Sequence, residues 1–483
     1  MSEGRTRKLV KETGWFAVGN FGSKILTLLL VPLYTNILTT GEYGTVDIIT
    51  TTINLLIPVL TLDMASGVFR FALDKNCDTR SVASNCIIVT CFSSLGLLLI
   101  FPLINLFLPS VARYWWFFFF IYMFNSMSSV LSSFMKGIDK SHIFAVQGIV
   151  YTFFFASCNI LFLLVFRFGI EGYLISLIIA HLASCAFIYI AGHVRRYFSF
   201  SKVNKSLMKE ILKFSAPLIP ASVAWWVMSS IDRYMLLYMC SEEANGLYGV
   251  AHKLPSVITV LTTFFINAWQ ISAVRNMNDE DAAEYTSKIY KMLFISGVAI
   301  CFSMVIASEL LGRMMFAKGF FKAWTMTPTL SIATVFSTLT LFIGAQFTAS
   351  KRSDLHLKSN IIAMITNVAL NYGLIRSFGI NGAAYGTMIS YFIVLIYRHV
   401  KVKELIDFEY DSFKLYLTCG LLMGSGILVS FNVPYYYVYS AGFFLIVLII
   451  FRKDYTEMYK SFVRVLKNRK KKKNGNMSPQ GEE

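Results

Sequence analysis

The sequence consists largely of apolar runs of roughly 20 residues, separated by short polar segments. An α-helix of that length crosses the hydrocarbon core of a bilayer, where the backbone has to satisfy its own hydrogen bonds. The strands of a membrane β-barrel would alternate apolar and polar residues, whereas these runs are continuously apolar. Only 15% of the residues are charged, against about a quarter in soluble proteins. The chain is therefore predicted to be an all-α integral membrane protein.

The apolar runs predict about 14 transmembrane helices. They lie near residues 14–38, 43–68, 82–108, 113–134, 142–167, 171–192, 213–240, 245–273, 288–311, 325–349, 356–376, 380–399, 413–432 and 435–451. An even number of spans places both termini on one side of the membrane. Most of the 44 Lys and Arg residues then fall on that side, as the positive-inside rule requires of cytoplasmic segments. We therefore predict a multi-pass protein with cytoplasmic N- and C-termini.

This topology also accounts for the net charge of +17, so the charge does not indicate a nucleic-acid partner. The basic run Lys470–Lys473 is expected to contact anionic lipid head groups or to be solvated. Membrane lipids are therefore expected partners of the chain, and nucleic acid is not.

Two stretches of the sequence align without a gap and indicate an internal duplication. They begin with Gly41-Glu42-Tyr43-Gly44 and Gly246-Leu247-Tyr248-Gly249, and they end at Arg70 and Arg275. A second pair follows in the same order, Gly169-Ile170-Glu171-Gly172 and Gly379-Ile380-Asn381-Gly382. Each repeat holds six spans, so the two lobes should have the same orientation. We expect them to be related by a pseudo-two-fold axis along the membrane normal.

The duplication predicts three parts of the chain. Residues 1–200 form an N-lobe of six helices, and residues 201–408 form a C-lobe of six, entered through a cytoplasmic amphipathic linker. Residues 409–483 supply two extra C-terminal helices, which have no counterpart in the repeat, and a basic cytoplasmic tail.

Ionisable residues and prolines concentrate in the first two spans and in their repeat equivalents, the seventh and eighth. The ionisable residues are Lys24, Asp47, Asp63, Asp232, Arg233, His252 and Lys253. The prolines are Pro32, Pro58, Pro217, Pro220 and Pro255. Charges inside a membrane are costly, and proline bends a helix, so such helices are expected to line a cavity or a moving interface.

The cations in these spans predict a site for an anionic ligand, because Lys and Arg make strong charge-assisted hydrogen bonds to phosphate. Lys24, Arg233 and Lys253 are the deep candidates, although Lys24 could instead form a buried bridge with Asp47 or Asp63. Arg70 and Arg275 end the two repeats, where they either frame a cytoplasmic mouth or simply follow the positive-inside rule.

Other residues of these spans are candidates for further roles. Trp269 could stack on a sugar ring, with Gln270 bonding a hydroxyl, although packing is the commoner role of a buried Trp. The candidates for coupling to H⁺ or Na⁺ are Asp47, Asp63, Asp232 and His252. The sequence has no phosphate-binding loop, zinc-protease motif or nucleophile elbow, and its six His residues are scattered. We expect no catalytic residue, no metal site and no cofactor.

With these features the chain resembles the multidrug/oligosaccharidyl-lipid/polysaccharide exporter superfamily, in particular its polysaccharide (Wzx-type) flippase branch. The residues that carry the resemblance are the helix Phe16–Leu38 with Gly41–Gly44, Asp232-Arg233-Tyr234 with Gly246–Gly249, Asn267-Ala268-Trp269, and Gly379–Ala384. The resemblance implies a V-shaped transporter of the bacterial cytoplasmic membrane, not an enzyme. Its substrate would be an undecaprenyl-pyrophosphate-linked oligosaccharide, flipped to the outer leaflet by alternating access for surface polysaccharide such as O-antigen. A polysaccharide polymerase and a chain-length regulator would be possible partners.

Two alternative functions stay open at this point. One is a cation-coupled multidrug exporter of the same fold, which should have an acidic cavity. The other is a membrane polysaccharide polymerase, against which the short predicted outer loops argue.

Overall fold

The computed structural model describes residues 28–74, 77–275, 281–408 and 410–456. Within these ranges the chain is helical, and the predicted all-α membrane fold is confirmed. Eleven of the described helices are long and apolar enough to cross a membrane, or twelve if α12 and α13 form one bent span. Each predicted span from 43–68 onward corresponds to a helix or a pair of helices. The count of 14 is not established, because most of the span 14–38 lies outside the described residues and α20 has only 15 residues.

One group of helices precedes the predicted linker. It comprises α2 (Val31–Ile37), α3 (Thr40–Leu60), α4 (Met64–Ala72), α5 (Thr79–Phe107), α6 (Pro109–Arg113), α7 (Trp115–Gly137), α8 (Ser141–Asn159) with the π-helical η1 (Ile160–Val165), and α9 (Gly169–Ala191). The linker contains η2 (Val194–Arg196), η3 (Phe200–Lys202), α10 (Lys205–Ser215) and η4 (Ala216–Leu218).

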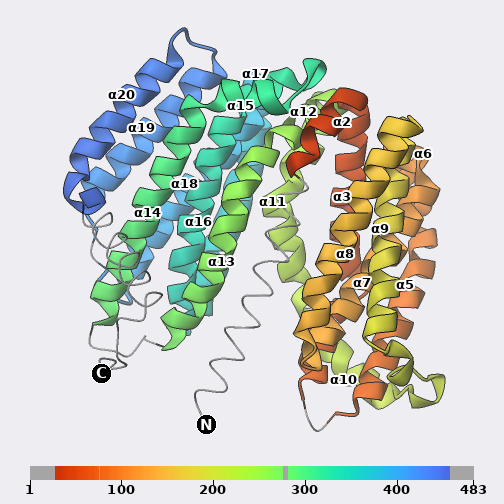
Figure 1. Ribbon diagram of the computed structural model, residues 1–483. Coiled ribbons are helices and arrows are strands. Elements are labelled where there is room, and N and C mark those ends of the chain that lie inside the picture. The colour runs from red at the N-terminus through yellow and green to blue at the C-terminus, as the bar shows by residue number, and fades with distance from the viewer. Residues whose placement is uncertain (1–27, 75–76, 276–280, 409, 457–483) are drawn as a thin grey trace, which may run out of the picture.

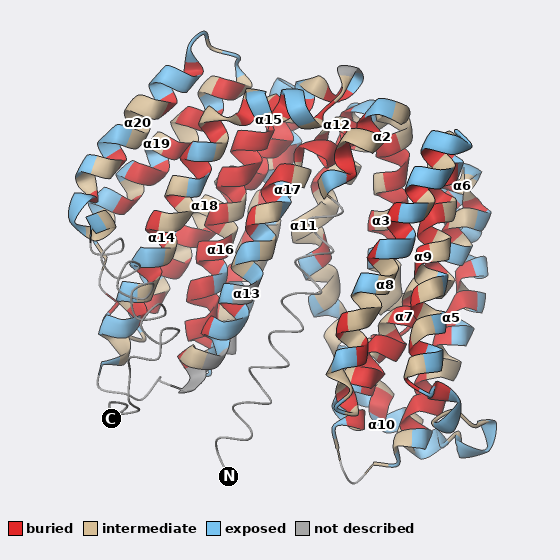
Figure 2. Ribbon diagram, in the orientation of Figure 1, coloured by how far each residue is buried: buried red, intermediate tan, exposed pale blue. Residues whose placement is uncertain are grey.

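The second group of helices follows the linker. It comprises α11 (Ile219–Met239), α12 (Glu242–Ala251), α13 (Lys253–Arg275), α14 (Ala282–Ile306), α15 (Ser308–Met315), η5 (Lys318–Thr325), α16 (Thr327–Ala349), α17 (Ser353–Phe378), α18 (Ile380–Val402), α19 (Ser412–Ser430) and α20 (Tyr436–Ile450). Helix α16 forms the core of this group. Within an apolar stretch of 18 residues in this helix, long enough to cross most of a bilayer, 83% is buried (Figure 2).

The two groups meet at one end of the molecule and diverge toward the other (Figure 1). Helices α2, α3, α11 and α12 lie together at the end where the groups meet, which we call the junction side. Helix α10 lies at the opposite end, which we call the linker side. Asn204 caps α10 by accepting hydrogen bonds from the N–H groups of Ser206 and Leu207, and Ile211 packs against Gly67 of α4.

Both repeats interrupt their proline-containing helix, but at different places. In the first repeat, α3 contains Pro58 and ends at Leu60, after which Leu62 and Asp63 adopt left-handed φ angles of 53° and 50°. In the second repeat, α12 and α13 meet at His252 with a bend of 43°, just before Pro255. The duplicated sequence therefore forms two helix pairs with different geometry.

Candidate functional site

The two copies of the repeated glycine motif touch each other on the junction side. Gly44 of α3 lies against α12 so closely that a side-chain carbon at this position would collide with the backbone carbonyl of Glu242. A carbon added at Gly246 would collide in the same way with the carbonyl of Thr40. Only glycine permits such an approach of two backbones, as in the small-residue contacts of membrane helices.

Polar contacts reinforce this crossing of α3 and α12. Asn245 donates from Nδ2 to the carbonyl of Gly44 at 3.0 Å, and Thr45 Oγ1 donates to Glu242 Oε2 at 3.2 Å. Nearby, Thr35 donates to the carbonyl of Met315 at 3.2 Å, which joins α2 to α15. The helices before the linker are thus tied to those after it along the junction side (Figure 1).

A cluster of charges lies one helical turn farther along α3. Asp47 Oδ2 is 2.9 Å from Arg233 Nε of α11, and both side chains are about 15% exposed or less. The Nε–H does not align with this oxygen, so the contact is an ion pair rather than a linear hydrogen bond. Arg233 Nη1 also lies 3.7 Å from Asp232 Oδ1 and donates to the carbonyl of Ser229 at 2.9 Å. Arg233 therefore bridges a carboxylate from each group of helices.

Asp232 is the buried end of this cluster, with 4% of its surface exposed. Tyr248 of α12 donates its hydroxyl to Asp232 Oδ2 at 2.5 Å, and Thr387 of α18 approaches the same oxygen at 3.5 Å. Asn367 of α17 contacts Thr387 at 3.5 Å, and Asn371 donates to Asn367 Oδ1 at 3.1 Å. Asp232 of α11 thus receives polar contacts from α12 and α18, and α17 extends this network through Thr387.

The sequence analysis did not single out Tyr248, Thr387, Asn367 or Asn371 as functional residues. The signal that could have found the last two is their spacing, since two Asn residues four positions apart face one side of a membrane helix. Tyr248 stood out only as part of the repeat.

His252 and Lys253 lie at the break between α12 and α13, beside the charge cluster. The His252 ring meets Tyr248 edge to face at 4.7 Å, and its Nε2 is buried with no hydrogen-bond partner among the described residues. The Lys253 ammonium lies 5.8 Å from the centre of the Tyr43 ring of α3, a cation–π contact between the two repeats.

The remaining predicted residues do not join this cluster. Arg70 is exposed in the last turn of α4, and Asp63 is the buried residue that precedes the same helix. Gln270 is exposed on α13. Arg275 is the last residue of α13 and its side chain is outside the described part of the chain, as is the whole of Lys24. The structure therefore brings together Asp47, Asp232, Arg233, His252 and Lys253.

Trp269 packs inside the second group of helices in this conformation. Its Nε1 donates to the carbonyl of Phe342 at 3.1 Å, and the two rings stack with centres 4.2 Å apart. The residue is 4% exposed. Trp226 is held similarly, with its Nε1 donating to the carbonyl of Thr51 at 2.9 Å. In this conformation Trp269 therefore has the packing role that the sequence analysis gave as the alternative to sugar binding.

Comparisons with known proteins agree with this architecture. A family model described as "Polysaccharide biosynthesis protein" matches residues 9–270. The chain is 25% identical over 247 residues to the probable low-salt glycan biosynthesis flippase Agl15 of Haloferax volcanii, covering 48% of this chain and 52% of that protein. The chain thus spans about half the length of this curated relative.

Solved transporter structures share the fold at low sequence identity. The lipid II flippase MurJ in an inward closed conformation matches with a TM-score of 0.69 and 13% identity, covering 93% of this chain and 99% of that one. An inward-facing multidrug resistance MATE family transporter of the MOP superfamily matches with a TM-score of 0.68 and 13% identity, covering 80% and 98%. At such identities the likeness concerns the fold alone.

Proposed function

We propose that this chain, which belongs to the polysaccharide biosynthesis protein family, flips a lipid-linked oligosaccharide across a membrane by alternating access. The observation that carries the proposal is the closed junction side, where the two repeats meet through glycines and an ion pair. Contacts of this kind can separate and re-form as rigid groups of helices rock against each other. The fold and the function implied by the family support a transporter rather than an enzyme.

The orientation follows from charge. The linker carries the basic residues Arg195, Arg196, Lys202, Lys205, Lys209 and Lys213. Under the positive-inside rule the linker side faces the cytoplasm, and the predicted topology places both termini there as well. The conformation described here would then be closed to the outside, in the cytoplasmic membrane of a bacterium.

The proposed substrate is an oligosaccharide linked to undecaprenyl pyrophosphate, and its phosphates are the groups that the cations would attract. In the closed conformation Arg233 is neutralised by Asp47 and Asp232. A pyrophosphate that reaches Arg233 from the linker side would compete with Asp47 for the guanidinium. Loss of the ion pair would weaken the junction, so substrate binding would favour outward opening. Lys253, Lys24, Arg70 and Arg275 would assist along the path, with Trp269 and Gln270 as candidates for sugar contacts.

The cluster around Asp232 supports coupling to a cation. A carboxylate buried among Tyr248, Thr387 and Asn367 offers oxygen ligands to Na⁺ or a proton-accepting site. Asp47 is tied to Arg233, Asp63 lies apart, and His252 lies beside the Tyr248 ring, so Asp232 is the foremost of the four candidates.

The test is transport of a lipid-linked oligosaccharide by the purified chain in proteoliposomes. The fraction of labelled substrate that becomes accessible to an external glycosidase should rise with time in the presence of the protein. Arg233→Gln should reduce the rate by about tenfold or more, as expected for loss of a charge-assisted contact to phosphate. Arg313→Gln, at an exposed intrahelical ion pair of α15, is the matched control. A rate no higher than that of empty liposomes would contradict the proposal.

The second candidate is a cation-coupled multidrug exporter, which the fold of the MATE transporter also accommodates. Asp47 and Asp232 would provide the acidic site that cationic drugs require. Export of a cationic dye by the same proteoliposomes, without oligosaccharide transport, would favour this function. Formation of glycosidic bonds by the pure protein would favour a polymerase instead.

A further inference from the structure

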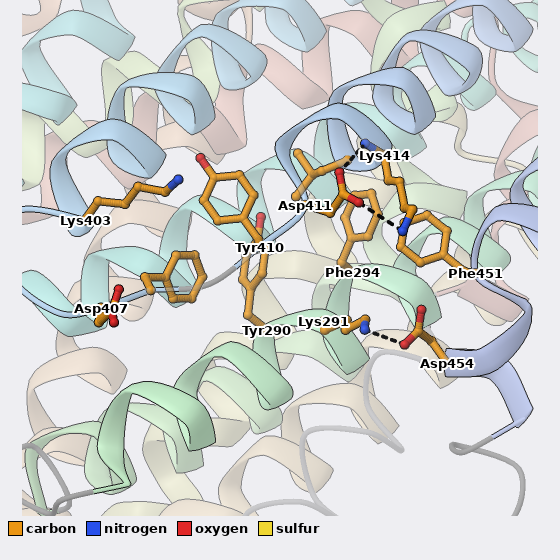
Figure 3. Close-up of a pocket in the computed structure, with 12 residues that line it drawn as sticks. Tyr290, Lys291, Phe294, Lys403, Asp407, Tyr410, Asp411, Lys414, Phe451 and Asp454 are labelled. Atoms are coloured by element: carbon orange, nitrogen blue, oxygen red, sulfur yellow. Dashed lines mark hydrogen bonds and ion pairs between the residues drawn. The ribbon is translucent and has the colours of Figure 1, made fainter.

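The second group of helices holds a pocket that is remote from the junction side. Its volume is about 580 Å³, within the range of roughly 300–1,000 Å³ that small-molecule sites occupy. The pocket lies among the first half of α14, the segment between α18 and α19, the start of α19 and the residues that follow α20 (Figure 3). Residues of α19 and residues that follow α20 thus help to build this pocket, and both helices are additions to the repeat.

Three lysines and three aspartates line the pocket, and most of these charges neutralise one another. Lys291 pairs with Asp454, and Lys414 pairs with Asp411 at 2.9 Å (Figure 3). Hydrogen bonds from the side chain and backbone N–H of Lys414 lower the pKa of the Asp411 carboxyl, so this pair stays charged. Of the six charged residues that line the pocket, one lysine and one aspartate are outside these two pairs.

The remaining charges are Lys403 and Asp407, which lie at the same end of the pocket (Figure 3). Neither has a partner of opposite charge within ion-pair distance among the described residues. The Lys403 ammonium lies over the Tyr410 ring at 4.5 Å from its centre. An available cation and an available carboxylate at the same end of one pocket fit a ligand that carries both charges.

The pocket floor is a set of packed aromatic rings. Tyr290, Phe294, Phe408 and Phe451 are each 6% exposed or less. The Tyr290 hydroxyl is held at 2.6 Å from His399 Nε2, which fixes its ring. Such a floor supports a ligand by apolar contact and leaves recognition to the charged rim.

Exposed apolar side chains lie on α19 and α20, the two helices whose ends adjoin the pocket. Phe413 and Ile449 are 76% and 74% exposed, and Leu417 and Ile446 are also exposed. In a membrane protein such a surface faces acyl chains, and the pocket lies at the ends of the spans, where lipid head groups are found. A ligand with a charged head and hydrocarbon tails would contact both surfaces.

We propose that this pocket binds the head group of a zwitterionic phospholipid, with its phosphate on Lys403 and its primary ammonium on Asp407. The equal number of lysines and aspartates disfavours an anionic head group, because it offers no excess positive charge. A carboxylate favours a primary ammonium over a quaternary one, because only the former donates N–H hydrogen bonds. The inference does not depend on the substrate proposed for the junction side.

Native mass spectrometry of the purified full chain tests the proposal. The protein would be titrated with phosphatidylethanolamine, phosphatidylcholine or phosphatidylglycerol of identical acyl chains. We expect phosphatidylethanolamine to be retained most strongly, and Lys403→Ala and Asp407→Asn each to weaken its retention by about tenfold. The matched controls are Lys401→Ala and Glu404→Gln, which alter an ion pair between the last turn of α18 and the following segment; neither residue lines the pocket.

Two results would overturn the proposal. One is equal or stronger retention of phosphatidylglycerol, which would indicate an anionic-lipid site. The other is retention of phosphatidylethanolamine that is the same in the pocket variants and the controls. An unchanged unfolding temperature of Lys403→Ala and Asp407→Asn would show that lost retention does not come from misfolding.

Discussion

At the scale of single residues, the ion pair between Asp47 of α3 and Arg233 of α11 joins the two groups of helices. Asp47→Asn removes the anion but keeps the size of the side chain. We expect it to weaken the closed junction by about 1–2 kcal/mol, the range of a charge-assisted contact, and so to raise the outward-open population roughly tenfold. Distances between spin labels on the two groups of helices would measure this population.

The exposed pair of Glu309 and Arg313 supplies the control for that experiment, because it lies within α15 alone. Glu309→Gln should leave the spin-label distances unchanged. The exchange variant Asp47→Arg with Arg233→Asp should restore part of the closed population, since it re-forms the pair with reversed polarity. Closed populations that are the same in Asp47→Asn and the wild type would contradict a gating role.

Asp232 provides a second prediction at this scale. If the buried carboxylate of Asp232 binds the coupling cation, as we propose, Asp232→Asn should abolish the dependence of transport on a pH or Na⁺ gradient. Asp63→Asn serves as the comparison, since Asp63 lies at the start of α4, away from the cluster. Initial rates in proteoliposomes with and without each gradient would be compared. A gradient effect that is lost in Asp63→Asn and kept in Asp232→Asn would show that Asp63, not Asp232, is the coupling carboxylate.

At the scale of helices, the crossing of α3 and α12 requires glycine at Gly44 and Gly246. Alanine at either position would meet a backbone carbonyl, which cannot move without moving its helix. We expect Gly44→Ala to lower stability by about 1–3 kcal/mol, as for other overpacked sites, and to open the junction. Unfolding temperature and the same spin-label distances would report both effects.

Gly96 of α5 is the matched control for this substitution. No atom lies within 4 Å of a side-chain carbon added there, so Gly96→Ala should be neutral or slightly stabilising. Helix propensity alone would make both substitutions stabilising, so an equal loss of stability in Gly44→Ala and Gly96→Ala would mean that the close crossing of α3 and α12 does not explain the result.

Much of the fold was predictable at the scale of helices, because apolar length and repeat spacing are local properties of the sequence. The sequence placed Gly41–Gly44 and Gly246–Gly249 at equivalent positions, but it did not predict that the two motifs touch. That contact depends on how the repeats rotate against each other. The pairing of Arg233 with Asp47 was missed for the same reason, since these residues lie on helices that the chain joins only through long connections.

At the scale of the whole molecule, alternating access predicts that a locked junction stops transport. Thr45 of α3 and Glu242 of α12 are in hydrogen-bond contact across it, with their side-chain oxygens 3.2 Å apart. We would replace the eight native cysteines with serine and introduce Thr45→Cys with Glu242→Cys. A short bifunctional thiosulfonate reagent should join the new thiols, hold the junction closed and reduce transport to the level of empty liposomes.

Reversal distinguishes a locked conformation from a damaged protein. A reducing agent cleaves the added disulfides and should restore the rate, whereas a misfolded protein would stay inactive. Each single-cysteine variant treated with the same reagent should keep its rate, because one thiol cannot bridge the two helices. The contacts at the junction have to break in every cycle if the lobes alternate, so undiminished transport by the cross-linked protein would exclude this motion. The substrate would then have to pass through the molecule without separation of α3 from α12.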